Sequence, residues 1–231
     1  MSRFDAVLFD KDGTLFDFGA TWVAWAEAFL LRACAQDRAQ ATRVGRGIGF
    51  DLEARRFDPG SIVIAGTPAQ VAEAIGPHFP QYGPATLIDL LNEEAARAPQ
   101  AEVVPLVPLL GRLRSAGLRL GVVTNDAEIP ALAHLDAAGA RDLFDFVAGF
   151  DSGFGAKPAP GPLLAFCDRL GVNPARCVMV GDSLHDLHAG RAAGMATVGV
   201  LTGMARSDTL APQADAVLPD IGHLPLWLGI P

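Results

Sequence analysis

The segment DKDGT at residues 10–14 carries the side chains best suited to chemistry. Asp10 and Asp12 lie two residues apart directly after a short apolar run, so both carboxylates can point into one cavity where the chain leaves a strand. A carboxylate is ionised at neutral pH, and Asp10 could therefore attack phosphorus directly and form an aspartyl-phosphate. Asp12 could then protonate the leaving oxygen and later activate a water molecule. An isolated Asp-Gly pair would indicate only a turn, but the longer pattern after an apolar strand favours a catalytic interpretation.

Three further residues could bind the phosphate group. Thr124 and Asn125 end a second apolar run, where a hydroxyl and an amide could hold phosphate oxygens beside the start of a helix. Taken alone, this pair would be ordinary helix N-caps. Lys157 opens a helix, a position that is unfavourable for a cation and therefore favours a functional role. Lys11 and Lys157 are the only lysines in the sequence, and we expect Lys157 to neutralise both the phosphate and the nucleophile.

Acidic residues that follow a further apolar run predict a metal site. Asp182 and Asp186 follow another apolar run and lie four residues apart, so both can face one direction through the first turn of a helix. Attack by an anion on a phosphate needs a cation nearby, and oxygen ligands favour Mg²⁺. We expect Asp182 to bind the ion directly, with Asp186 behind it.

Short apolar runs and helical patterns alternate around these motifs, which predicts an α/β fold with an open, doubly wound, Rossmann-like parallel sheet. The expected strands are Phe4–Phe9, Leu118–Val123, Phe146–Gly149, Cys177–Val180 and Thr197–Leu201, with an edge strand at Asp215–Leu218. The expected helices between them are Val107–Ala116, Ile129–Ala138, Pro162–Leu170 and Leu184–Ala193. Ligands of such sheets bind beyond the carboxyl ends of the strands, where all the polar clusters fall.

Residues 19–99 interrupt this alternation with a mainly helical pattern, which predicts a helical cap domain inserted after the first strand. The expected cap helices are Thr21–Ala35, Pro68–Ile75 and Pro84–Ala98, and residues 62–64 could be a strand or a turn. The catalytic core would then comprise residues 1–18 and 100–231. We expect the cap to determine substrate specificity. Its polar candidates, each more simply explained as part of a solvated helix face, are Arg43, Arg46, Arg55, Arg56, Thr67, His78 and Tyr82.

Two tryptophans and two histidines allow a functional or a structural interpretation. Trp22 and Trp25 could form a wall of the substrate pocket, but their spacing of three is more typical of the core of the cap. His185 and His188 lie beside the acidic pair, and we expect both on the surface of a helix.

The order of DxDGT, Thr, Lys-Pro and GDxxxD resembles the haloacid dehalogenase superfamily, specifically its phosphatases with a helical cap after the first motif. The segments FDKDGTLFD and AKPAPGPLL are most similar to its phosphoglycolate phosphatase-like members. The resemblance implies that Asp10 is the nucleophile, Asp12 the general acid and base, and Thr124 and Lys157 the phosphate ligands. It also implies Mg²⁺ held by Asp10, the Asp12 carbonyl and Asp182. The substrate would be a small phosphorylated metabolite, phosphoglycolate-like or a sugar phosphate.

Two alternatives stay open at this point. A sugar phosphomutase would use the same Asp10 but return the phosphoryl group to a sugar instead of water, a difference that depends on cap closure. A non-catalytic binding module could also use this scaffold, although the full set of motif residues argues against it.

Composition limits the partners and the compartment. Half of the 231 residues are apolar, and the formal net charge of −8 argues against nucleic acid as the main ligand. The three cysteines lack a CxxC spacing, which favours reduced thiols. No signal peptide or membrane-spanning run is evident, so we expect a soluble cytoplasmic protein, either a monomer or a homodimer.

Overall fold

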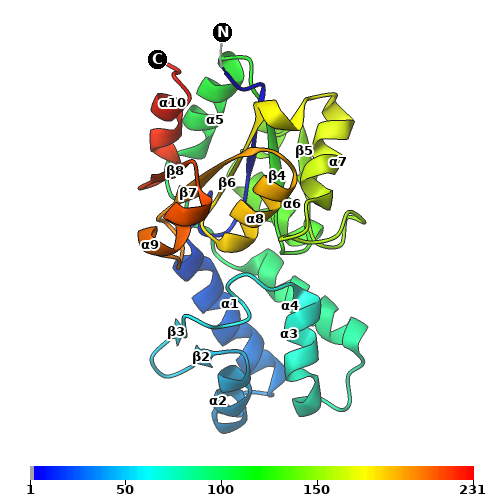
Figure 1. Ribbon diagram of the computed structural model, residues 1–231. Helices are drawn as coiled ribbons and strands as arrows, with labels where there is room; N and C mark the ends of the chain where they lie inside the picture. Colours follow the sequence, from blue (N-terminus) through cyan, green and yellow to red (C-terminus); the bar gives the residue numbers. More distant parts are fainter. Residues whose placement is uncertain (1–2) are drawn as a thin grey trace.

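Six strands form the central sheet of the computed structural model, which describes residues 3–231 (Figure 1). All neighbouring strands pair in parallel, in the order β5-β4-β1-β6-β7-β8, so the chain winds outward in both directions from β1. The predicted α/β, doubly wound fold is confirmed. The strands are β1 (Ala6–Phe9), β4 (Arg119–Val123), β5 (Phe146–Ala148), β6 (Cys177–Gly181), β7 (Ala196–Val200) and β8 (Ala216–Leu218).

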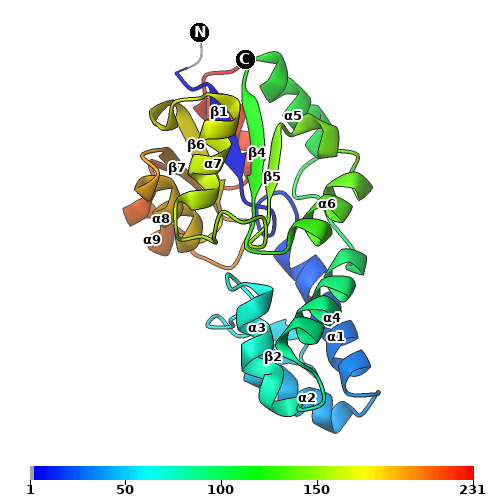
Figure 2. The same ribbon diagram turned by 90° about the vertical axis from the view of Figure 1, so that its right-hand side faces the viewer.

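Helices cover both faces of this sheet, and the side chains of β1 alternate between them. Val7 and Phe9 belong to the apolar core on one face, and Ala6 and Leu8 belong to the core on the other. The helices α5 (Leu106–Ser115), α6 (Glu128–Ala137) and α10 (Leu224–Trp227) lie over the first face. The helices α7 (Gly161–Leu170) and α8 (Leu184–Ala192) lie over the second, as Figure 2 shows, and the short α9 (Ser207–Leu210) follows β7. A strand buried on both faces is apolar at every position, which explains the continuous apolar runs of the sequence.

An insertion of four helices follows β1 and lies beyond the carboxyl ends of the strands (Figures 1 and 2). It contains α1 (Phe18–Ala33), α2 (Arg38–Gly47), the antiparallel pair β2 (Phe50–Asp51) and β3 (Arg56–Phe57), α3 (Pro68–Ile75) and α4 (Pro84–Arg97). The helix α1 begins three residues before the expected Thr21, because the Asp17 side chain accepts a hydrogen bond of 2.7 Å from the Ala20 N–H and caps it. Residues 62–64 form a turn.

This insertion, called the cap below, has an apolar core distinct from the two cores of the sheet. Trp25 stacks on Phe29 within α1, and its indole N–H donates a hydrogen bond of 3.1 Å to the Leu91 carbonyl of α4. Arg32 of α1 pairs with Glu93 and Glu94 of α4 on the outside of the same contact. The cap therefore has an apolar core and polar contacts of its own. Within residues 3–231, no helix has both the length and the apolar character needed to cross a membrane.

Candidate active site

The side chain of Lys157 lies between two carboxylates at the carboxyl edge of the sheet. Its ammonium group is 2.6 Å from Asp10 Oδ1 and 2.6 Å from Asp186 Oδ1. Asp10 follows β1, Asp186 lies in the first turn of α8, and all three side chains are buried. The structure thus brings together the predicted nucleophile, the predicted phosphate-binding lysine and one acidic residue of the predicted metal site.

Burial determines the charge state of this group. It raises the pKa of Asp10 to about 7, an effect that Lys157 opposes and that Asp186 and Asp12 reinforce. Burial also raises the pKa of Asp182, and the neighbouring Asp10 and Asp186 carboxylates add to it. Burial alone would lower the pKa of Lys157, but Asp10 and Asp186 outweigh it and raise the pKa above the ordinary range of lysine. The site therefore has more negative charge than Lys157 can balance, which a bound cation would relieve.

The arrangement of the acidic side chains fits a small divalent cation. Carboxylate oxygens of Asp10, Asp182 and Asp186 lie within 4.8 Å of one another, and all three residues are buried. Two glycines leave room for Asp182: a Cβ atom would come within 2.6 Å of Asp182 Oδ2 at Gly13 and within 1.6 Å at Gly203. An all-oxygen donor set of this kind is what Mg²⁺ prefers.

Asp186 is held more firmly than the other two members of this set. Its Oδ1 accepts the hydrogen bond from Lys157, and its Oδ2 accepts bonds from the Ser183 hydroxyl at 2.6 Å and the Ser183 N–H at 3.1 Å. Asp10 and Asp182 thus have the freer carboxylates, in keeping with the expectation that Asp186 lies behind the direct ligands.

Thr124 and Asn125 lie next to the nucleophile at the end of β4. The Thr124 hydroxyl accepts a hydrogen bond of 3.1 Å from the Asp126 N–H, which leaves its own proton available to a phosphate oxygen. The side-chain amide of Asn125 donates to the carbonyls of Lys157 and Ala65, both at 2.9 Å, and accepts from the Lys157 N–H at 2.9 Å. Asn125 therefore fixes the backbone of Lys157 and ties it to the cap. A role for either residue in binding phosphate stays a prediction.

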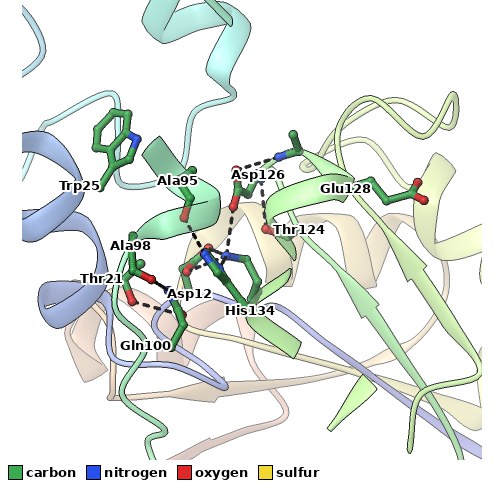
Figure 3. Close-up of polar contacts among 12 residues, drawn as sticks. Asp12, Thr21, Trp25, Ala95, Ala98, Gln100, Thr124, Asp126, Glu128 and His134 are labelled. Atoms are coloured by element: carbon green, nitrogen blue, oxygen red, sulfur yellow. Dashed lines mark hydrogen bonds and ion pairs between the residues drawn. The ribbon is translucent and has the colours of Figure 1, made fainter. Parts of the chain in front are cut away.

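Lys11 forms a second buried ion cluster behind Asp12. Its side chain is fully buried, and its ammonium group lies 2.8 Å from Asp12 Oδ2 and 3.0 Å from Asp126 Oδ2. The third contact, at 2.8 Å, is with Nδ1 of His134 in α6. Figure 3 shows Asp12, Asp126 and His134 converging on one point below Ala95 of the cap. The predicted general acid and base is thus held by a lysine whose contacts come from three segments of the chain.

The contacts of His134 identify its tautomer. An ammonium group only donates hydrogen bonds, so Nδ1 accepts from Lys11 and the ring proton lies on Nε2. The Nε2–H group donates to the carbonyl of Ala95 in α4 at 2.7 Å (Figure 3). Burial lowers the pKa of His134 to about 4, and the positive charge of Lys11 adds to this. A neutral imidazole therefore links the cluster at Asp12 to the cap.

A cavity between the cap and the edge of the sheet contains these catalytic candidates. Trp22 and Trp25 line it and also belong to the apolar core of the cap, so the structural interpretation is confirmed and a role in binding substrate stays a prediction. Of the seven polar cap candidates, only Thr67 lines it. His185 lies on its wall too, half-buried, and not on an outer helix surface as predicted. The lining residues are Asp10, Asp12, Phe18, Trp22, Trp25, residues 63–68, Val71, Leu91, Asn92, Ala95, Thr124, Asn125, Asp126, Lys157, Asp182, Ser183, His185 and Asp186.

Comparison with known proteins places the chain in a family. Residues 4–194 match the haloacid dehalogenase-like hydrolase model. The chain is 36% identical to phosphoglycolate phosphatase of Rhodospirillum rubrum, over 98% of this chain and 91% of that protein. It is 32% identical to N-acetylmuramic acid 6-phosphate phosphatase of Pseudomonas aeruginosa, over 87% of this chain and 83% of that protein. The solved structure of a HAD phosphatase from Thermococcus onnurineus is 26% identical, covers 98% of both chains and superposes with a TM-score of 0.68.

The chain belongs to the haloacid dehalogenase-like hydrolase family. The predicted family and the predicted class of enzyme, a phosphatase of this family, are both confirmed.

Sequence reasoning missed Asp126 and His134 as parts of the site. Asp126 directly follows the Thr124-Asn125 pair at the end of a strand, and this position could have identified it. His134 is 123 residues from Lys11 in the sequence, and no local pattern relates the two.

Proposed function

We propose that the protein is a Mg²⁺-dependent phosphatase that hydrolyses a small phosphomonoester through a phosphorylated Asp10. The observation that carries the proposal is the position of Asp10, buried at the end of β1, 2.6 Å from Lys157 and beside Asp182. A carboxylate paired with a buried ammonium group and facing a cavity is a prepared nucleophile rather than a turn residue.

In the proposed reaction, each of the candidate catalytic and phosphate-binding residues has one role. Asp10 attacks phosphorus, and the bond from phosphorus to the leaving oxygen breaks while Asp12 donates a proton to that oxygen. Water then attacks the aspartyl-phosphate, Asp12 takes a proton from it, and inorganic phosphate leaves with Asp10 restored. Lys157 and Thr124 hold the phosphoryl oxygens as negative charge develops on them.

Asp10, Asp182 and the backbone carbonyl of Asp12 would hold Mg²⁺, with Asp186 beside them. When bound, the ion supplies positive charge against the phosphate oxygens. The residues of the chain alone place one ammonium group against three carboxylates, so Lys157 would not suffice to hold a dianionic phosphate there.

The substrate would be small, either phosphoglycolate-like or a sugar phosphate, because the cap closes over the cavity. The two named relatives act on phosphoglycolate and on N-acetylmuramic acid 6-phosphate, which both fit this description.

The test is release of inorganic phosphate from a panel of small phosphate esters, with Mg²⁺ and with chelator. We expect release only with Mg²⁺, and we expect Asp10→Asn to abolish it. Asp208→Asn changes the same type of side chain at an exposed position of α9 and should retain activity. Hydrolysis in ¹⁸O-water should place the label in the released phosphate. A product that is an isomer of the substrate, without phosphate release, would instead indicate a mutase, and turnover by Asp10→Asn would refute the proposal.

A further inference from the structure

The cavity offers no free cation to a second anionic group on the substrate. Among its lining residues, Lys157 is the only lysine or arginine, and both of its carboxylate partners lie in the same site. Five aspartates line the cavity as well: Asp10, Asp12, Asp126, Asp182 and Asp186. A substrate carboxylate would therefore lie among like charges and apolar side chains, where an unpaired charge is costly.

The arginines of the cap lie elsewhere. Arg32 and Arg97 pair with Glu94, and Arg55 pairs with Glu27, all outside the set of lining residues. The cap wall is instead mainly apolar and includes Phe18, Trp22, Val63, Ile64, Val71 and Leu91. This wall matches the apolar face of a leaving group rather than a charged one.

Two polar atoms on this wall have no partner. The Nε1 atom of Trp22 and the Oδ1 atom of Asn92 are both buried, and neither forms a hydrogen bond within the described chain. Trp22 is 8% exposed. Trp25 differs, because its indole N–H is already bonded to the Leu91 carbonyl. Buried polar atoms are nearly always hydrogen-bonded, so an unpaired donor and an unpaired acceptor on one cavity wall indicate a ligand group that can satisfy them. A hydroxyl group both donates and accepts.

We propose that the cap selects phosphomonoesters whose leaving alcohol is uncharged, has an apolar face and carries a further hydroxyl group, which bonds to Trp22 Nε1 and Asn92 Oδ1. A monosaccharide phosphate has this chemistry, and 2-phosphoglycolate does not. This inference rests on the proposed phosphatase function and narrows its substrate class. It attributes the preference for a hydroxylated over a carboxylated ester to an uncharged donor in α1, Trp22 Nε1, and an uncharged acceptor in α4, Asn92 Oδ1.

The test compares esters that differ in one group. The first pair is 2-hydroxyethyl phosphate and 2-phosphoglycolate, in which a hydroxymethyl group replaces a carboxylate. The second pair is 2-hydroxyethyl phosphate and ethyl phosphate, which lacks the hydroxyl. We expect kcat/KM for the hydroxylated ester to exceed that for 2-phosphoglycolate by at least tenfold. Trp22→Phe, which keeps a ring but removes the N–H, should lower the ratio of hydroxyethyl to ethyl phosphate about tenfold. Trp227→Phe is the matched control and should leave this ratio unchanged, because Trp227 lies in α10 and does not line the cavity.

Binding to the Asp10→Asn variant, measured by calorimetry with the same three esters, separates this inference from the proposed function. If no ester is hydrolysed but the binding preference for the hydroxylated ester depends on Trp22, the phosphatase proposal fails and the inference stands. If 2-phosphoglycolate is preferred in both turnover and binding, or if Trp22→Phe leaves the ratio of hydroxyethyl to ethyl phosphate unchanged in both, the inference is overturned. Asn92→Lys should raise the relative kcat/KM for 2-phosphoglycolate by placing a cation on the wall, and its failure to do so would also count against the assigned position.

Discussion

Replacing Lys11 by methionine should destabilise the protein far more than the loss of an ordinary ion pair. Methionine has a similar length and no charge, so the change removes the ammonium group with little change in volume. The side chain of Lys11 is 0% exposed and that of its partner Asp126 is 2% exposed. After the change, the Asp126 Oδ2 atom and His134 Nδ1 would be left buried without their partner. Removal of one member of a buried pair costs about 3–5 kcal/mol, a large fraction of a total stability of about 5–15 kcal/mol.

Urea unfolding followed by circular dichroism at pH 7 measures this cost. The matched control is Arg141→Met, which breaks a pair with Asp136 whose two side chains are 48% and 53% exposed. An exposed pair contributes only about 0–1 kcal/mol, so the two substitutions should differ clearly in their free energy of unfolding. A double-mutant cycle with Asp126→Asn isolates the pair, because neutralising Asp126 relieves the unpaired charge that Lys11→Met creates. We expect the double variant to be less destabilised than the sum of the two single variants.

Two results would refute this reasoning. One is a cost for Lys11→Met of no more than about 1 kcal/mol, similar to that of the exposed pair. The other is a cycle in which the two changes add within about 0.5 kcal/mol, as they do for residues that do not interact.

Three further predictions follow from the same geometry. Burial lowers the pKa of His134 to about 4 in the folded protein, from the value of 6.5 that is usual for an exposed histidine. The unfolded chain therefore binds a proton that the folded chain does not, and the stabilisation present above pH 6.5 should fall by up to about 3 kcal/mol as the pH drops towards 4. The difference between the urea stabilities of the wild type and His134→Gln, followed over this range, should show this loss, and a flat difference would contradict it. Mg²⁺ at 100 times its dissociation constant should stabilise the protein by about 2.7 kcal/mol in thermal unfolding, and Asp182→Asn should remove most of this effect. Equal Mg²⁺ stabilisation of both proteins would exclude Asp182 as a ligand. Gly203→Ala should abolish phosphatase activity, because its Cβ would lie 1.6 Å from Asp182 Oδ2, whereas Gly111→Ala in α5, with no atom within 4 Å, should be active and no less stable. Full activity of Gly203→Ala would show that the position of Asp182 does not matter.

The sequence was sufficient to predict the sheet, and to predict which polar residues gather at the carboxyl ends of its strands, for a simple physical reason. Strands buried on both faces are apolar throughout, and polar residues can appear only where each strand ends. Asp10, Thr124 and Asp182 were identified in this way, and the structure places all three beside one cavity. The helix α2 was missed because it is mostly polar, and only a few apolar residues such as Ala41 and Val44 mark its buried face. The β2–β3 hairpin was missed because strands of two residues are too short to show an alternating pattern.

The attachment of the cap to the sheet explains why local sequence patterns could not reveal the rest of the site. Asn125 donates to the carbonyl of Ala65, and His134 donates to the carbonyl of Ala95. Both acceptors are backbone atoms, so neither cap position requires a particular side chain to make the contact. The donors, in contrast, belong to side chains that also contact Lys157 and Lys11. A change in the position of the cap would therefore alter the contacts of both lysines. The side chains of α1 and α4 that face the cavity take no part in this attachment, so they can differ according to the substrate.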